Sequence, residues 1–129
     1  MYLDSTVNYI STDRERQVIP YVEVTDKQGK VTVYRDEYGV PQIYADNLHD
    51  LFFAQGYVQA QDRLFQMDFQ RRVGTGTLSE VLGEATLETD RFLRTLGTNR
   101  AAAKDLEVMS QETLSDLQAY ADGVNAYIS

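Results

Sequence analysis

The sequence has 129 residues and a net charge of −8, with 43% hydrophobic and 25% charged residues, which is an ordinary composition for one globular domain. Because an acidic chain repels phosphate groups, this charge argues against nucleic acids and anionic membrane surfaces as partners. The chain has no cysteine and one histidine, which argues against thiolate chemistry, a His-rich metal site and a Ser-His-Asp triad.

The N-terminal third of the chain is typical of a short tail followed by β-strands. Residues 1–19 are polar and aperiodic, and we interpret them as an extension. Three short segments then carry the alternation or β-branched content of strands. They are 21–25, 31–35 and 40–45. The polar connection between the first two segments ends at Gly29, which predicts a hairpin. Gly39 suits a turn with positive φ. Pro41 places the third segment at a sheet edge or at the start of a strand.

From residue 46 onward the spacing of apolar residues changes to that of helices. Five helices are expected, over residues 48–72, 77–82, 86–96, 98–108 and 111–129. The first follows the N-cap residue Asn47, and its apolar surface is so wide that we expect it to be largely buried. Gly83 and Gly97 are expected to end the second and third helices, and Ser110 to cap the last. The predicted fold class is α+β, with short N-terminal strands followed by about five helices.

Asp62 and Arg63 are the most unusual feature of the first helix, because both lie on its apolar stripes. Adjacent helical residues point in different directions, so these two side chains cannot easily pair with each other. A buried charge without a partner is costly, so each is expected to meet an opposite charge on another element. We therefore favour a structural ion-pair network over a catalytic role for them.

The remaining motifs predict neither a catalytic nor a metal site. His49 falls in the first turn of the long helix, where we expect a surface or capping residue. Residues 74–76 read Gly-Thr-Gly but lack the rest of a phosphate-binding loop, and Asp36, Glu37 and Asp46 do not have EF-hand spacing. No serine stands in a G-x-S-x-G or S-x-x-K arrangement. From the residues alone, the chain is an α+β piece with a buried charge network.

Four segments, in this order, carry a resemblance to a known family. They are 33–45 (VYRDEYGVPQIYA), 56–67 (GYVQAQDRLFQM), 71–72 (RR) continued by 76–83 (GTLSEVLG), and 119–126 (AYADGVNA). They resemble the N-terminal part of the α chain of the penicillin acylase (penicillin amidase) family, with Gln42 standing where that family often has His. The resemblance covers about residues 31–129. The chain is therefore divided into an N-terminal extension with the first strand, 1–30, and a family part, 31–129.

The resemblance implies an N-terminal-nucleophile hydrolase of αββα fold, of which this chain is a fragment. In that family a precursor cuts itself into an α and a β chain, and the β chain begins with the nucleophilic serine. Its hydroxyl attacks the amide, and its α-amino group, whose pKa lies near neutrality, acts as the base. These groups belong to the β chain, so no catalytic residue is assigned here, and this chain alone is predicted to be inactive. The family's calcium ligand lies beyond residues 123–125 of the α chain, so no metal or cofactor is expected.

The function that the resemblance implies is cleavage of the acyl side-chain amide of penicillins or related N-acyl compounds. The alternatives are an acyl-homoserine-lactone acylase of the same family and a non-catalytic acidic helical interaction module. The implied partners are the β chain of the same precursor and a small N-acyl substrate, in the periplasm or outside the cell, although no signal peptide is visible. Five residues are expected to make buried contacts with that β chain, and through such faces the fragment alone would form a non-native dimer. They are Tyr57, Phe65, Met67, Phe69 and Tyr120.

Overall fold

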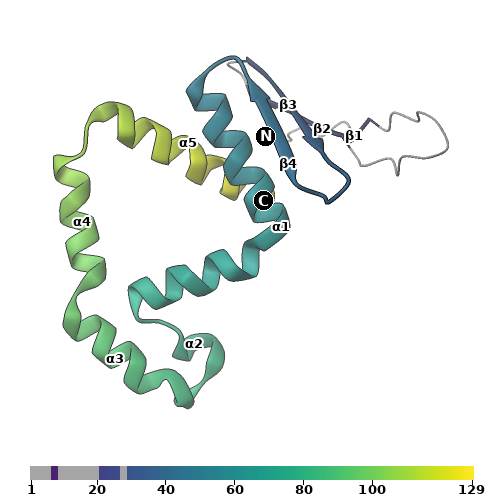
Figure 1. The fold of residues 1–129 in the computed structure, drawn as a ribbon. Helices are drawn as coiled ribbons and strands as arrows, with labels where there is room; N and C mark the ends of the chain where they lie inside the picture. The colour runs from purple at the N-terminus through teal and green to yellow at the C-terminus, as the bar shows by residue number, and fades with distance from the viewer. Residues whose placement is uncertain (1–6, 9–20, 27–28) are drawn as a thin grey trace. The chain divides into compact units, whose positions relative to one another are not determined.

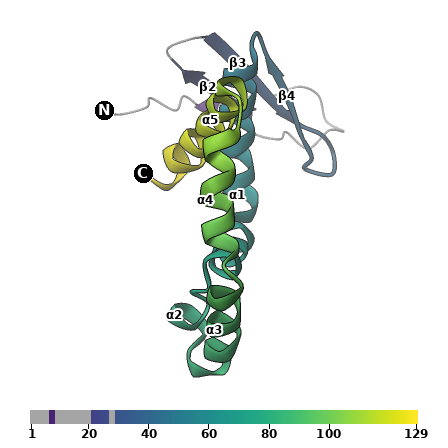
Figure 2. The same cartoon turned by 90° about the vertical axis from the view of Figure 1, so that its left-hand side faces the viewer.

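The computed structural model describes residues 7–8, 21–26 and 29–129, and its element order is strands first and helices afterwards (Figures 1 and 2). The strands are β1 (Val7–Asn8), β2 (Tyr21–Asp26), β3 (Gly29–Arg35) and β4 (Pro41–Ala45). The helices are α1 (Leu48–Thr75), α2 (Ser79–Leu82), the 3-10 helix η1 (Glu84–Thr86), α3 (Leu87–Leu96), α4 (Thr98–Val108) and α5 (Gln111–Ile128). The α+β fold class and the number of helices predicted from the sequence are confirmed.

The chain folds as two compact units, and α1 contributes to both. The first unit comprises the described residues up to Gln59 together with Ser115–Ser129, so it contains the sheet, the first part of α1 and most of α5. The second unit is Ala60–Leu114 and contains the rest of α1, then α2, η1, α3 and α4.

The sheet of the first unit is antiparallel throughout, with the strand order β1-β2-β3-β4. The predicted hairpin is formed by β2 and β3, and Pro41 is the first residue of β4, as expected for a residue that cannot donate a backbone hydrogen bond. The turn before β4 is built by Asp36, whose Oδ1 accepts the backbone N–H of Tyr38 and of Val40, each at 2.9 Å. Gly39 has φ of 78° in this turn, which confirms its predicted role.

The core of the first unit lies between the sheet and the first half of α1. Alternation along β3 turns Val31 and Val33 to the same face, where they are buried against Ala54 and Val58 of α1. The β4 side chains Ile43 and Ala45 pack on this cluster from the neighbouring strand.

The N-terminus of α1 is closed by the side chain predicted to cap it. The Asn47 Oδ1 atom accepts the backbone N–H of Asp50 at 2.9 Å, and its Nδ2 donates to Asp50 Oδ2 at 2.7 Å. Asp50 is fully buried, which the sequence did not predict. His49 lies beside it, with Nδ1 3.3 Å from Asp50 Oδ1 and the ring partly exposed, in keeping with a residue of the capping turn.

The expectation that the first helix is largely buried is wrong for its second half. Phe53, Ala54 and Val58 are buried, but Phe65 is 72% exposed. The helical backbone angles are interrupted at Arg63, with φ of −143° and ψ of 27°. Residues after Gln59 belong to the second unit, and the described elements of that unit do not cover the apolar stripe that continues through Phe65.

The predicted ends of the later helices are confirmed. Gly83 follows α2 with φ of 77°, and Gly97 follows α3 in the left-handed conformation with φ of 83°. At the start of α5, Ser110 Oγ accepts the backbone N–H of Thr113 at 3.1 Å. Among the helices described here, none is long and apolar enough to cross a lipid bilayer.

Candidate functional site

Two of the segments that carry the resemblance meet where α1 crosses α5, and a glycine from each lies at the crossing. A Cβ atom on Gly123 would lie 2.8 Å from the carbonyl carbon of Phe53 and closer still to its oxygen. A Cβ atom on Gly56 would lie 3.0 Å from the carbonyl carbon of Tyr120, again with the oxygen closer. Real Cβ atoms do not come this near to backbone, so the two helices are in direct backbone contact and leave no room for a side chain.

Tyrosine side chains hold the same crossing together. The Tyr120 hydroxyl donates a hydrogen bond to Gln59 Oε1, and the rings of Tyr57 and Tyr127 meet edge to face with centroids 5.6 Å apart. Burial raises the pKa of Tyr120, which favours the protonated hydroxyl that acts as the donor. Tyr57 and Tyr120 are half-buried by these contacts within the chain itself.

The other residues singled out in the sequence lie on α1 beyond this crossing and are more exposed. Asp62 and Arg63 are both exposed, and the Arg63 guanidinium donates to Gln66 Oε1 at 3.2 Å. The rings of Phe65 and Phe69 lie 6.5 Å apart with exposed fractions of 72% and 36%, and Met67 is half-buried. Their burial against another polypeptide, and an interior ion pair at Asp62 and Arg63, stay predictions.

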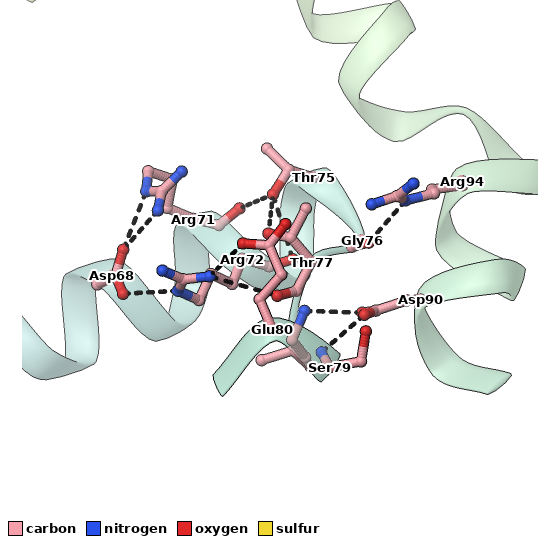
Figure 3. A network of polar contacts seen from close by, with 11 residues as sticks. Asp68, Arg71, Arg72, Thr75, Gly76, Thr77, Ser79, Glu80, Asp90 and Arg94 are labelled. Carbon is pink, nitrogen blue, oxygen red and sulfur yellow. Dashed lines mark hydrogen bonds and ion pairs between the residues drawn. The ribbon is translucent and has the colours of Figure 1, made fainter. Parts of the chain in front are cut away.

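A network of charged side chains joins the end of α1 to α2 in the second unit (Figure 3). The Asp68 carboxylate accepts from Arg71 Nη2 and from Arg72 Nε, each at 2.7 Å. Arg72 Nη1 also donates to Glu80 Oε2 at 2.9 Å. The hydrogen bond from Arg72, followed by that from Arg71, lowers the pKa of Asp68. The same contacts raise the pKa of Arg72, with Asp68 the larger cause and Glu80 the next.

Asp90 connects α3 to the start of α2 and is buried, with 3% of its surface exposed. Its Oδ1 accepts the backbone N–H of Leu78 at 2.9 Å, and its Oδ2 accepts that of Ser79 at 2.7 Å. Burial by itself raises the pKa of Asp90, but the hydrogen bonds from Ser79 and Leu78 and the charge of Arg94 outweigh it and lower the pKa. One turn further along α3, Arg94 Nε donates to the carbonyl of Gly76 at 2.7 Å.

The burial of Asp90 was not predicted, although the sequence contains a signal for it. The residue lies three positions from both Leu87 and Leu93, so it falls on the apolar stripe of α3. A carboxylate on such a stripe indicates a buried acceptor, the same argument that was applied to Asp62. What the sequence does not reveal is the pair of backbone amides that Asp90 binds, because they lie 12 and 11 residues earlier in the chain.

Acid is expected to weaken this network. The folded-state pKa values of Asp68 and Asp90 are lowered from 3.8, so their stabilisation is complete above that value and is lost as the pH falls through the folded-state values. We expect the urea midpoint to fall between neutral pH and about pH 3. In an Asp68→Asn variant the fall should be smaller. An equal fall in both proteins would contradict a contribution from Asp68.

The two clusters, which are the α1–α5 crossing and the charged network of the second unit, have contacts that hold helices in place. In the described ranges, no group of three or more His, Cys, Asp or Glu side chains could hold a metal ion. The three carboxylates of the second unit's network, Asp68, Glu80 and Asp90, accept hydrogen bonds from arginines or backbone amides. The clusters therefore fix the segments that carry the resemblance rather than present a nucleophile.

Comparison with known proteins gives one consistent family. The model of the family described as penicillin amidase matches residues 30–129. Over 99 residues the chain is 46% identical to penicillin G acylase from Escherichia coli and 41% identical to penicillin acylase 2 proenzyme from Pseudomonas sp. (strain SE83). Over 98 residues it is 41% identical to the acyl-homoserine lactone acylase QuiP from Pseudomonas aeruginosa. These matches cover 76–77% of this chain but only 12–13% of each relative, so the chain spans about an eighth of their length.

A solved structure supports the same relationship. The thermostable penicillin G acylase from Alcaligenes faecalis superposes on this chain with a TM-score of 0.71 and 39% sequence identity. The superposition covers 79% of this chain and 54% of the solved chain.

Proposed function

The chain belongs to the penicillin amidase family, and on this basis we propose that it is the N-terminal part of the α chain of an enzyme that cleaves the acyl side-chain amide of penicillins or related N-acyl compounds. The observation that carries the proposal is the 46% identity to penicillin G acylase over 99 residues. The family match over residues 30–129 contains all four segments described above. Membership supports an amidohydrolase, and the substrate class follows from the names of the relatives.

In the proposed enzyme the nucleophile is a serine at the start of a separate β chain. Its hydroxyl attacks the amide carbonyl while its own α-amino group takes the proton, and the amine leaves before water releases the acyl group. An α-amino group has a pKa near 7.7–8.0 and can act as a base at neutral pH without a histidine. The role of the present chain is to supply a rigid crossing of α1 and α5 and a fixed α1–α2 connection, on which the β chain packs.

A second candidate substrate class is supported by the acyl-homoserine lactone acylases among the relatives, at up to 41% identity. Both substrate classes contain an acyl group on an amide nitrogen, so one reaction type serves both. The non-catalytic interaction module is disfavoured, since the matched region keeps all four segments of an enzyme family in order.

The proposal is tested with the longer protein that contains this chain. The purified protein should release the free amine from penicillin G. Release of homoserine lactone from an N-acyl-homoserine lactone is measured to test the alternative substrate class. The 129-residue chain alone should release neither product. A variant in which the first serine of the β chain is replaced by alanine is the matched control. Failure of the longer protein to hydrolyse any N-acyl compound would overturn the proposal.

We further propose that this part of the protein binds no calcium and that the enzyme works in the periplasm or outside the cell. Both statements rest on the family relationship. Metal analysis of the purified chain and fractionation of cells that produce the longer protein test them. Bound calcium at one equivalent per chain, or activity confined to the cytoplasm, would contradict them.

Substitution of Asp62 is expected to have different effects in the chain alone and in the assembled protein. In the chain alone Asp62 is exposed, so Asp62→Ala should change the free energy of unfolding by no more than about 0.5 kcal/mol. In the assembled protein an ion pair buried by the β chain would lose one partner, at a cost of about 3–5 kcal/mol, and processing of the precursor should fail. The matched control is Asp105→Ala, on exposed α4. Normal processing of the Asp62 variant would show that this carboxylate is not buried on assembly.

A further inference from the structure

The sheet extends beyond the part of the chain that is shared with the family. The family match begins at residue 30, whereas β2 comprises Tyr21–Asp26. β2 nevertheless pairs along β3 in a continuous antiparallel register, from Val22 opposite Val33 to Asp26 opposite Gly29. One hydrogen-bonding edge of the family strand β3 is therefore covered by residues outside the family match (Figure 1).

That edge would be attractive to other strands if β2 were absent. β3 lies between β2 and β4, and its Val31 and Val33 are anchored in the core, so the strand is held extended by packing on α1. Residues 31–34 read Val-Thr-Val-Tyr, which is rich in β-branched side chains and contains no charge. Natural edge strands are protected by lysine, proline, bulges or a covering segment. In β3 the charged residues Lys30 and Arg35 stand only near the two ends, and the centre of the strand, 31–34, contains neither lysine nor proline.

We propose that the edge of β3 that faces β2 is a strand-docking site and that residues 21–26 occupy it in this chain. Recognition at such an edge is mainly through backbone hydrogen bonds, so the partner it fits is an extended antiparallel strand. When the occupant is removed, the site takes a second copy of this chain. Each copy then presents the same strand with its uncharged centre, 31–34, and two such edges can pair antiparallel about a two-fold axis.

The β4 edge does not account for the same behaviour. Among the described strands β4 is paired only with β3, so its outer edge is open whether or not β2 is present. Association through β4 would therefore be the same in the complete chain and in a shortened one. Only association through β3 depends on residues 21–26.

The test compares the complete chain with one that begins at Gly29. The shortened chain keeps the buried cluster of Val31, Val33, Ala54 and Val58 and the whole family match, so the core is retained. Light scattering after gel filtration should show a larger assembly for the shortened chain than for the complete chain at equal concentration. A synthetic peptide of residues 19–28 should reverse this. The same peptide with Val24→Pro should bind at least about tenfold more weakly, because proline cannot donate to the ladder.

A second measurement does not depend on the shortened chain. In the complete chain, Val24→Pro should speed hydrogen exchange of the β3 backbone amides by about tenfold or more, with little change in α3. The proposal is overturned if the shortened chain has the same assembly state as the complete chain, or if the wild-type and proline peptides act equally. It is also overturned if Val24→Pro leaves exchange in β3 unchanged. None of these readouts depends on amide hydrolysis, so they are independent of the proposed enzyme.

Discussion

Replacing Gly123 with alanine is expected to lower the free energy of unfolding by at least about 3 kcal/mol, a loss at the upper end of the range for an overpacked site. The added methyl group would lie 2.8 Å from the carbonyl carbon of Phe53 and 3.0 Å from the backbone nitrogen of Tyr57. Both obstacles are main-chain atoms in α1, so no rotamer change relieves the overlap. The helices must separate, which also breaks the contact between Tyr120 and Gln59.

The matched control for this substitution is Gly74→Ala, near the C-terminal end of α1. A Cβ atom there would have no heavy atom within 4 Å, and the backbone of the residue does not require positive φ. Alanine should therefore stabilise this helical position by about 0.5–1 kcal/mol. Urea unfolding of the two variants and the parent measures both effects. If Gly123→Ala were as stable as the parent, α1 and α5 would not be in backbone contact in solution.

The parts of the fold that the sequence predicted are those governed by neighbours in the chain. The turn at Gly39, the cap at Asn47 and the helix end at Gly97 each depend on a few consecutive residues. The β2–β3 hairpin likewise follows from alternation on both sides of one short connection. Such local preferences can be read from one sequence because no distant contact is needed to satisfy them.

The parts that the sequence did not predict depend on contacts between distant residues. Gly56 and Gly123 each look like ordinary helix-weakening residues until α1 and α5 are placed against each other. Asp50 and Asp90 are hydrophilic by type, and their burial is tolerated only because an amide side chain or two backbone N–H groups reach them. The resemblance marked the segments that contain both glycines, but only the helix crossing gives the physical reason why alanine cannot replace them.

The exposed second half of α1 shows the opposite error. Its apolar stripe predicts burial, yet Phe65 is 72% exposed in this chain. Periodicity reports which face of a helix is suited to be covered, and it does not report which polypeptide covers it. Since the relatives are about eight times longer than the matched part, a covering surface from elsewhere in the protein is consistent with the proposed enzyme.

Replacing Asp90 should cause the largest loss of stability of any carboxylate in the second unit. In Asp90→Ala the backbone N–H groups of Leu78 and Ser79 lose their acceptors in a buried setting. In Asp90→Asn one carboxylate oxygen becomes an NH₂ group, which cannot accept a hydrogen bond, while the other oxygen still accepts one. The loss of stability should therefore be smaller than in the alanine variant but still clear. Hydrogen exchange at the Leu78 and Ser79 amides should rise in both variants, and most in the alanine variant.

The control is Glu88→Gln on the same helix, whose side chain is 82% exposed and pairs only across one turn with Arg91. Exposed pairs of this kind contribute little, so its urea midpoint and amide exchange should match the parent. The Asp90 variants should also lose part of the acid sensitivity of the parent, because the lowered pKa of Asp90 no longer favours the folded state above about pH 4. Equal behaviour of the Glu88 and Asp90 variants would mean that Asp90 does not fix the start of α2, and the connection would then depend on Arg72 and Arg94.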